Sequence, residues 1–322
     1  MDRPSFSTDT RFRAGVPVMP ALNWRTLSGA LYSETSRGHA RFHVAGIVNV
    51  TPDSFYDGGH SLSVRAAVDR ALGLLGQGAG IVDFGAESTR PGAAEISATE
   101  EMSRLFPVVE LFRAEISRAG ERPCAGSCPG PYIPQDPCIS VDTYRAATAK
   151  KLLESGFTGV INDISGGTLD TAMDAVICEH RPGYVLGHCP APPREMQRNP
   201  RYTEVVEDLL AYFESRMNAL VARGLPEEAI ALDPCIGFGK STAHNLALIR
   251  EAWRFHALGR PLYYGISRKS FLAGFLPPGA DRGHLTQVAT ALLAERGVQL
   301  HRVHDVADTV ATLALVSNCK NS

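Results

Sequence analysis

Short apolar runs alternate along this chain with longer segments in which apolar residues recur every three or four positions. The short runs are typical of strands that are buried on both faces, and the longer segments are typical of amphipathic helices. The pattern predicts strands near 43–49, 80–84, 138–142, 158–163, 183–188, 229–233, 261–266 and 299–303. It predicts helices between and after them, over 64–77, 98–119, 144–155, 169–180, 202–223, 242–258, 284–296 and 306–316.

Eight strands that alternate with eight helices favour an α/β fold, a single (β/α)8 TIM barrel, with a doubly wound open sheet as the alternative. The length of 322 residues and the hydrophobic content of 44% allow one barrel with extensions or two smaller domains. We place the barrel at 41–319, after an N-terminal extension over 1–40 that shows no strong period. A segment rich in Pro and Gly at about 121–137 is interpreted as an inserted surface loop.

Charge and composition narrow the choice of partners. Lys and Arg total 32 against 34 Asp and Glu, and this net charge of -2 predicts no general nucleic-acid surface. The chain has no long apolar run and no signal-peptide core at its start, so we expect no membrane segment and a cytoplasmic location. The seven cysteines fit a reducing compartment. Cys124, Cys128 and Cys138 could bind a metal or form a cross-link, although zinc sites usually add a further closely spaced ligand pair.

The first apolar run passes directly into a polar loop that is stopped by Pro52. Asn49 and Thr51 bring neutral ligand atoms to this loop, and Asp53 adds a carboxylate. Taken alone, the loop is equally consistent with an ordinary capped connection between a strand and a helix. The same arrangement, however, returns at the other strand ends.

Polar residues follow nearly every predicted strand. They are Asn49, Asp83, the run Glu87-Ser88-Thr89-Arg90, Asp142, Asn162, Asp163, His188, Asp233, the run Ser267-Arg268-Lys269, Arg302, His304 and Asp305. Because the carboxyl ends of barrel strands form one rim, these residues converge on one mouth, and the pattern predicts an active site there. A single member could instead be a helix cap or a satisfied buried polar group, and we favour this structural interpretation for Asp163 and Asp305.

The residue types indicate what this rim could bind. Asp142, Asn162 and Asp233 are rich in acceptors and, once partly buried, need donors such as the amino group and ring N–H of a flat heterocycle. The two carboxylates come from the third and sixth strands, which favours separate recognition contacts over a shared proton.

Basic residues gather after the last two strands, where barrels commonly bind phosphate. Arg268, Lys269, Arg302 and His304 are expected to bring positive charge to this part of the rim and to bind an anion such as a diphosphate. Asn49 could complete the octahedron of a Mg2+ ion together with diphosphate oxygens and water. No nucleophile motif is visible, and the segment 237–240 lacks the spacing of a nucleotide-binding P-loop.

Seven segments, in order, closely resemble the dihydropteroate synthase family of folate biosynthesis. They are GIVNVTPDSFYDGG (46–59), ESTRPGA (87–93), ISVDTYR (139–145), VINDISGG (160–167), DPCIGFGK (233–240), GISRKSF (265–271) and RVHDV (302–306). The resemblance runs from about residue 43 to 317 and implies a (β/α)8 transferase. The implied reaction joins p-aminobenzoate to 6-hydroxymethyl-7,8-dihydropterin diphosphate and releases 7,8-dihydropteroate and diphosphate.

The resemblance also implies roles for individual residues. The pterin would be held by Asp142, Asn162, Asp233 and Lys269, and the diphosphate by Asn49, Arg302 and His304, with Mg2+ at Asn49. Catalysis would rest on Asp142, Lys269, Arg302 and His304. The p-aminobenzoate pocket would be bordered by Thr89, Arg90, Pro91, Phe238 and Ser267, and the loops 50–59 and 88–95 would close over the site. A homodimer through the last helices and a target for sulfonamides are further implications.

Several positions depart from the family pattern. The segment 187–191 reads Gly-His-Cys-Pro-Ala where the family shows M-H-M-Q-G, which removes a methionine near the pterin. Cys235 stands where the family has a glycine, and a positive φ there would strain a cysteine. Ala86 likewise stands for a glycine. Because the charged and amide positions remain, synthase activity is favoured over two alternatives, a pterin-binding methyltransferase domain and a catalytically impaired synthase paralogue that binds pterin.

Overall fold

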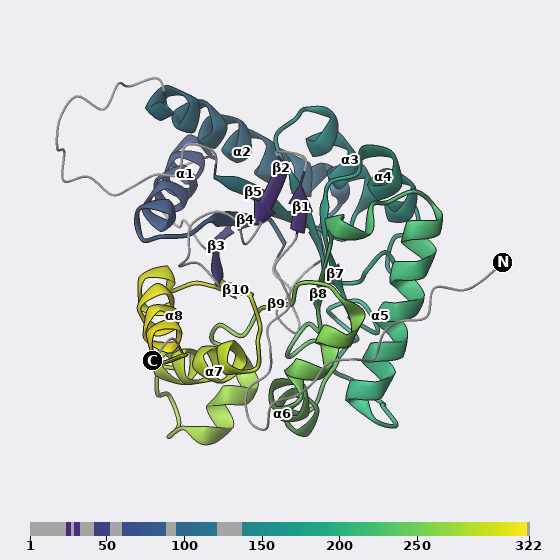
Figure 1. Ribbon diagram of the computed structural model, residues 1–322. Coiled ribbons are helices and arrows are strands. Elements are labelled where there is room, and N and C mark those ends of the chain that lie inside the picture. Colours follow the sequence, from purple (N-terminus) through teal and green to yellow (C-terminus); the bar gives the residue numbers. More distant parts are fainter. Residues whose placement is uncertain are drawn as a thin grey trace.

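The computed structural model describes residues 24–26, 29–32, 42–51, 60–87, 95–120 and 137–320. Its centre is a sheet of eight strands, all paired in parallel (Figure 1). These strands are β3 (His43–Asn49), β4 (Ile81–Gly85), β5 (Cys138–Asp142), β6 (Val160–Asp163), β7 (Gly183–Gly187), β8 (Ile230–Asp233), β9 (Tyr263–Tyr264) and β10 (Leu300–Val303).

The sheet closes into a barrel. Its strand order is β8-β7-β6-β5-β4-β3-β10-β9, and the two outer strands are joined by a parallel bridge between Leu232 and Leu262. The backbone N–H of Leu232 also donates to the carbonyl oxygen of Pro261 at 2.9 Å. The predicted TIM barrel is therefore confirmed, and the open doubly wound sheet is wrong.

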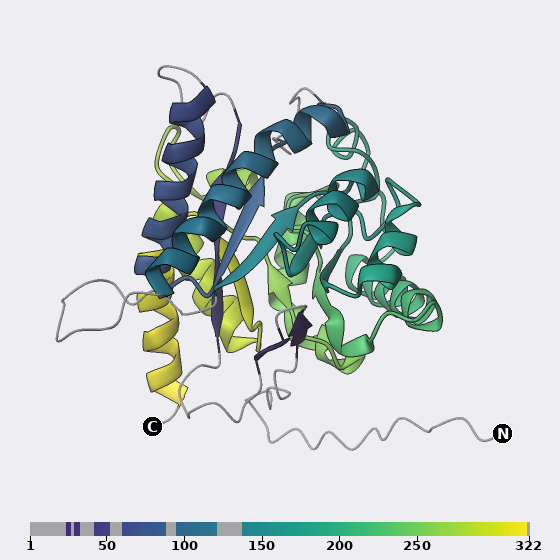
Figure 2. The same cartoon turned by 90° about the horizontal axis from the view of Figure 1, so that it is seen from above.

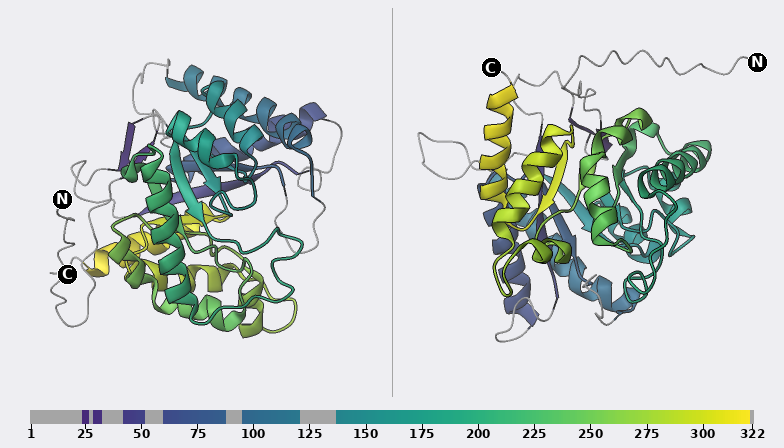
Figure 3. Two further views of the ribbon diagram at one scale, coloured as in Figure 1. Left: turned by 90° about the vertical axis from the view of Figure 1, so that its right-hand side faces the viewer. Right: turned by 90° about the horizontal axis from the view of Figure 1, so that it is seen from below.

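Helices surround the strands in the order that the sequence predicts. They are α1 (His60–Gly76), α2 (Ala98–Gly120), α3 (Ala146–Glu154), α4 (Met173–His180), α5 (Val205–Ala222), α6 (Thr242–Arg250), α7 (Gly283–Glu295) and α8 (Val306–Lys320), with short 3-10 helices η2 (Glu227–Ala229), η3 (Ala252–Leu258) and η4 (Ser270–Phe275). In Figure 1, α8 lies between α7 and α1, so the last helix of the chain completes the ring that the first one begins; Figures 2 and 3 show the same ring of helices from other sides. No helix among the described residues is long and apolar enough to cross a membrane.

Two predicted elements differ from the structure. The single helix expected over 242–258 is divided, because α6 ends at Arg250 and a 3-10 helix follows Glu251. This turn lets Phe255 pack edge-on against Phe213 of α5, with ring centroids 5.9 Å apart. The strand expected over 261–266 is shortened to Tyr263–Tyr264, preceded by the single bridge at Leu262.

The floor of the barrel is apolar. Successive residues of a strand point alternately into the barrel and toward the helices. Eight inward residues, one from each strand, form a buried cluster with Trp24; they are Ala45, Ile81, Cys138, Val160, Val185, Ala231, Tyr263 and Leu300. Cys138 is therefore a core residue, whereas Cys124 and Cys128 lie outside the described residues, so a metal site or cross-link among the three stays a prediction.

The expected N-terminal extension contains two strands that the sequence pattern did not predict. They are β1 (Trp24–Thr26) and β2 (Gly29–Tyr32), which pair antiparallel. Trp24 is fully buried, and its indole Nε1 donates to the carbonyl oxygen of Ala229 at 2.8 Å. This ribbon closes the amino-terminal end of the barrel, which leaves the opposite end for a site.

Candidate active site

Four polar or small residues line up across neighbouring strands near the carboxyl end of the barrel. Asn49 pairs in register with Gly85, Gly85 with Asp142, and Asp142 with Asn162. Paired residues of parallel strands point to the same side of the sheet. Asn162 pairs in turn with Val185, which belongs to the inward-facing floor cluster, so the whole row points into the barrel. Asn49, Asp142 and Asn162 thus share one layer of the barrel interior, as the strand-end pattern predicts.

Asp83 lies one layer deeper and connects this row. It is fully buried, and it accepts hydrogen bonds from Ser140 Oγ at 2.5 Å, Asn162 Nδ2 at 3.2 Å and Arg302 Nε at 2.6 Å. The second arm of the guanidinium, Arg302 Nη2, donates to Asp142 Oδ2 at 2.7 Å. Arg302 therefore bridges one buried and one partly buried carboxylate, whereas the resemblance implies a place beside a diphosphate. The sequence places Asp83 among the residues at the strand ends but gives it no specific role.

Burial shifts the ionisation of these carboxylates. It raises the pKa of Asp142 to about 7, and the charge of Arg302 opposes this rise. Burial also raises the pKa of Asp233 to about 6, against the hydrogen bond that Cys235 N donates to Asp233 Oδ1 at 2.7 Å. Both groups therefore titrate near neutral pH, which is typical of functional sites.

Lys269 and Phe238 face each other next to Asp233. The ammonium nitrogen of Lys269 lies 3.9 Å from the centroid of the Phe238 ring. Burial lowers the pKa of Lys269 to about 8, and the carboxylate of Asp233 is the first of the charges that oppose this shift. The structure thus brings together one cation, one carboxylate and one aromatic face that the sequence assigned to neighbouring parts of one pocket.

Cys235 adopts the strained backbone that its position predicts. Its φ is 52°, a value that suits the glycine of the family pattern better than a cysteine. The side chain is buried, and its thiol donates to the carbonyl oxygen of Ile164 at 3.6 Å. The backbone N–H of Cys235 donates to the carboxylate of Asp233, and this hydrogen bond stabilises the turn between the two residues.

The basic part of the rim carries less charge than the sequence indicates. Arg268 is exposed and forms a two-point ion pair with Asp305, with Nε–Oδ2 at 3.0 Å and Nη2–Oδ1 at 3.1 Å. Burial and the nearby charge of Arg302 lower the pKa of His304 to about 4, so its ring is neutral at pH 7. Of the four residues expected to bring positive charge to this part of the rim, Arg268 is thus paired with a carboxylate and His304 is neutral. Ser267 lies against the ring of His304, with Oγ 2.9 Å from Nδ1.

Lys240 is a buried residue whose role the sequence did not reveal. Its ammonium group donates to the carbonyl oxygens of Phe238 at 2.9 Å and His188 at 3.0 Å, and it ties the loop after β8 to the loop after β7. In that second loop, Cys189 lies with its Sγ 3.6 Å from Met196 Sδ, and both side chains are buried. A methionine is thus present beside the altered family segment, although it comes from further along the chain.

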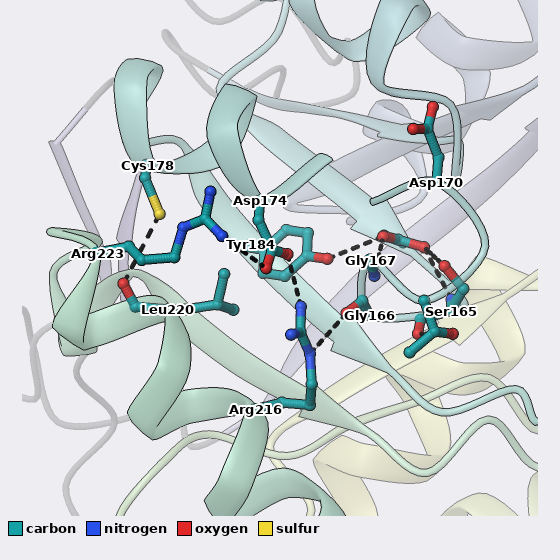
Figure 4. Close-up of polar contacts among 12 residues, drawn as sticks. Ser165, Gly166, Gly167, Asp170, Asp174, Cys178, Tyr184, Arg216, Leu220 and Arg223 are labelled. Carbon is teal, nitrogen blue, oxygen red and sulfur yellow. Dashed lines mark hydrogen bonds and ion pairs between the residues drawn. The ribbon is translucent and has the colours of Figure 1, made fainter. Parts of the chain in front are cut away.

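Asp163 points to the opposite side of β6, toward the helices. It is fully buried and accepts hydrogen bonds from Ser165 N at 2.8 Å, Ser165 Oγ at 2.7 Å, Gly167 N at 2.7 Å and Tyr184 Oη at 2.8 Å. Figure 4 shows this turn, where Arg216 continues the network through Gly166 O at 3.0 Å. The structural interpretation of Asp163 is confirmed. Asp305 is likewise occupied, by its pair with Arg268.

The predicted p-aminobenzoate residues Thr89, Arg90 and Pro91 lie outside the described residues. The residues on either side of them are held by Arg145. Its Nη1 donates to Glu87 Oε2 at 2.6 Å, and its Nη2 donates to the carbonyl oxygen of Ile96 at 2.6 Å. Arg145 follows Asp142 by three positions, so the segment that carries Asp142 also fixes both ends of the predicted loop.

Comparisons with known proteins agree with this geometry. The sequence family described as "Pterin binding enzyme" matches residues 45–119 and 132–304, and the unmatched residues between them fall largely within the predicted insertion. Dihydropteroate synthase of Escherichia coli (strain K12) is 36% identical over 275 residues, which are 85% of this chain and 90% of that protein. The enzyme of Synechocystis sp. is 35% identical over 268 residues, 83% of this chain and 86% of that protein.

Solved structures show the same relationship. The Xanthomonas albilineans dihydropteroate synthase with 4-aminobenzoic acid superposes with a TM-score of 0.76 at 33% identity, covering 88% of this chain and 94% of that one. The Yersinia pestis dihydropteroate synthase with a sulfonamide drug complex gives a TM-score of 0.74 at 34% identity, covering 88% of this chain and 95% of that one. The chain therefore belongs to the dihydropteroate synthase family of pterin binding enzymes, which are transferases.

Proposed function

We propose that this protein condenses p-aminobenzoate with 6-hydroxymethyl-7,8-dihydropterin diphosphate to give 7,8-dihydropteroate and diphosphate. The observation that carries the proposal is the inward-facing polar layer of Asp142 and Asn162, joined through Asp83 to Arg302. A related structure from Xanthomonas albilineans contains 7,8-dihydropteroate, the product of this reaction.

Asp142, Asn162 and Asp233 are proposed to accept hydrogen bonds from the amino group and ring N–H groups of the pterin. Buried acceptors discriminate strongly against rings that lack these donors, because the acceptors would then remain unsatisfied. Lys269 supplies a cation beside Asp233, at the edge of the same pocket. Phe238, Ser267, Thr89 and Arg90 are proposed to border p-aminobenzoate.

The reaction breaks the bond between the methylene carbon and the diphosphate oxygen, and it forms a bond from that carbon to the arylamine nitrogen. Positive charge that develops on the methylene carbon spreads into the pterin ring, and negative charge leaves with the diphosphate. Arg302 and His304 are proposed to bind that leaving group, which stabilises the developing charge. The arylamine is neutral at pH 7 and attacks without prior deprotonation, and the proton that its nitrogen loses after attack passes to the departing diphosphate or to water.

Mg2+ is proposed to arrive with the diphosphate and to contact the side-chain oxygen of Asn49. The described residues contain no group of three or more His, Cys, Asp or Glu that could hold a metal. The half-buried amide of Asn49, at the carboxyl end of β3, fits a single neutral ligand for a substrate-borne ion. Such an ion neutralises charge on the diphosphate oxygens.

A homodimer is proposed to form through α7 and α8. Val288 and Leu292, one turn apart on α7, are 53% and 44% exposed, and Leu315 of α8 is 67% exposed. Large apolar side chains on two adjacent helices are typical of a surface between identical subunits. Sedimentation of the protein and of Leu315→Glu tests this proposal, because the variant should sediment as a monomer if the helices pair. The cytoplasmic location stays a prediction.

The test of the activity is incubation of purified protein with Mg2+, the dihydropterin diphosphate and p-aminobenzoate. Formation of dihydropteroate and diphosphate in equal amounts is expected. Tight pterin binding without product would favour an impaired paralogue, and methyl transfer from a folate to a corrinoid would favour a methyltransferase.

A further inference from the structure

The hydroxyl of Ser267 makes two contacts with one histidine. The backbone N–H of His304 donates to Ser267 Oγ at 3.2 Å, and Nδ1 of the His304 ring lies 2.9 Å from the same oxygen. Ser267 is 7% exposed, so its own hydrogen needs an acceptor within the protein. No other described residue contacts this hydroxyl, and the backbone N–H can only donate. Among the described residues, Nδ1 of His304 is thus the one acceptor that this hydroxyl hydrogen can reach.

The direction of the Ser267 hydroxyl hydrogen determines which ring nitrogen of His304 carries hydrogen. If Nδ1 accepts from Ser267, the hydrogen of a neutral ring resides on Nε2. The surroundings favour the neutral ring, since Arg302, Arg268 and Arg70 outnumber the one nearby carboxylate, that of Asp305. Arg70 also donates to the backbone oxygen of His304 at 2.7 Å, which fixes the residue from the other side. Nε2 has no hydrogen-bond partner within the described part of the chain.

We propose that Ser267 is a positioning residue that holds His304 in the neutral tautomer with hydrogen on Nε2, and that this N–H donates to the diphosphate of the substrate. The second half of this inference rests on the proposed function. His304 then recognises the anion as an uncharged donor, and Arg302 supplies the positive charge.

The tautomer is tested by nitrogen NMR of the full-length, ligand-free protein labelled at histidine. The expected spectrum at pH 7 shows hydrogen on Nε2 and none on Nδ1 of His304, assigned by its loss in His304→Gln. Ser267→Ala should mix the two tautomers, and Ser267→Thr should restore the single one because it keeps the hydroxyl. Hydrogen on Nδ1, or on both nitrogens, would overturn the proposal.

The donor role is tested with two amide variants of His304. The amide nitrogen of glutamine reaches about as far as Nε2, whereas that of asparagine stops near Nδ1. Both variants should bind the dihydropterin diphosphate more weakly, and the dissociation constant of His304→Asn should exceed that of His304→Gln by about tenfold, the loss of one hydrogen bond. Equal constants would contradict the donor role. If the protein lacks synthase activity altogether, the proposed function fails, while the spectrum and the binding constants still decide this inference.

Discussion

Asn162 and Asp163 are neighbours in sequence, and yet they lie in two different environments. Asn162 faces the barrel interior, where its amide donates to Asp83 and leaves its oxygen available to a ligand. Asp163 faces the helices, where four donors already occupy its carboxylate. Both are almost fully buried, so burial alone does not distinguish them. The comparison shows that a buried polar group is a binding residue when its hydrogen bonds are incomplete and a structural one when they are complete.

The hydrogen-bond network inside the barrel, around Asn162, also differs in charge from the network on the helix side, around Asp163. Arg302 and the carboxylates of Asp83 and Asp142 form a chain of charges inside the barrel. The outer pair of Arg216 and Asp174, at 2.6 Å, instead ties α4 to α5 on the helix side of the barrel (Figure 4). The two networks should therefore respond differently to substitution.

The largest expected effect on binding comes from Asp142→Asn. The amide presents a donor where the pterin also presents donors, and Arg302 loses one of its two carboxylate partners. We expect pterin affinity to fall at least about 100-fold, or about 3 kcal/mol, which titration calorimetry with 6-hydroxymethylpterin would measure. Unchanged affinity would remove Asp142 from the pterin site.

Arg302→Ala should damage both binding and stability. The resemblance places Arg302 at the diphosphate, and that role alone would weaken binding of the diphosphate substrate with little change for the free pterin. Because Arg302 contacts Asp142, we now expect both affinities to fall, and two carboxylates left without their cation should cost about 3–5 kcal/mol of unfolding free energy. Denaturant unfolding measures the second quantity. Arg302→Lys is the matched control, and it should recover part of the stability. If Arg302→Ala is as stable as the unmodified protein and loses affinity only for the diphosphate substrate, Arg302 acts on the diphosphate alone.

Asp163→Asn should show the reverse pattern. The amide nitrogen replaces an acceptor that receives hydrogen bonds from the turn at 165–167 and from Tyr184, so we expect a loss of about 2–3 kcal/mol of unfolding free energy. The folded protein should keep its pterin affinity, since Asp163 faces away from the barrel interior. A selective loss of affinity without a loss of stability would break the distinction between the two faces of β6.

The smallest expected effect is a pH dependence of pterin binding. Because burial raises the pKa of Asp142 to about 7, its carboxyl is increasingly protonated below that pH and loses acceptor capacity. Pterin affinity should therefore rise between pH 6 and pH 8, by at most about tenfold per pH unit. For stability the sign is opposite: a raised pKa means that this group favours the folded state most at low pH, and that contribution disappears as the pH rises through 7. Asp163→Asn should keep the binding profile, and a flat profile in the unmodified protein would show that Asp142 remains charged.

Much of the site could be predicted from the sequence because strand ends of a barrel meet at one rim. The strand predicted over 43–49 has the observed bounds, and Asn49, Asp142 and Asn162 share a layer. The roles of Asp83, Arg145 and Lys240 could not be predicted, because each depends on partners more than 40 residues away in the chain. The charge of the rim was also overestimated, since the pairing of Arg268 with Asp305 depends on a side-chain direction.

The sequence by itself determined the barrel, the family and the residues that reach its mouth, because periodicity and local motifs are properties of neighbouring residues. Only the tertiary structure decided the hydrogen-bond partner of each polar side chain. It decided that Arg302 bridges two carboxylates and that Ser267 orients His304. The physical reason is that the donors around a buried acceptor come from other strands and helices. The residue type at one position does not determine which of these donors lie close to it.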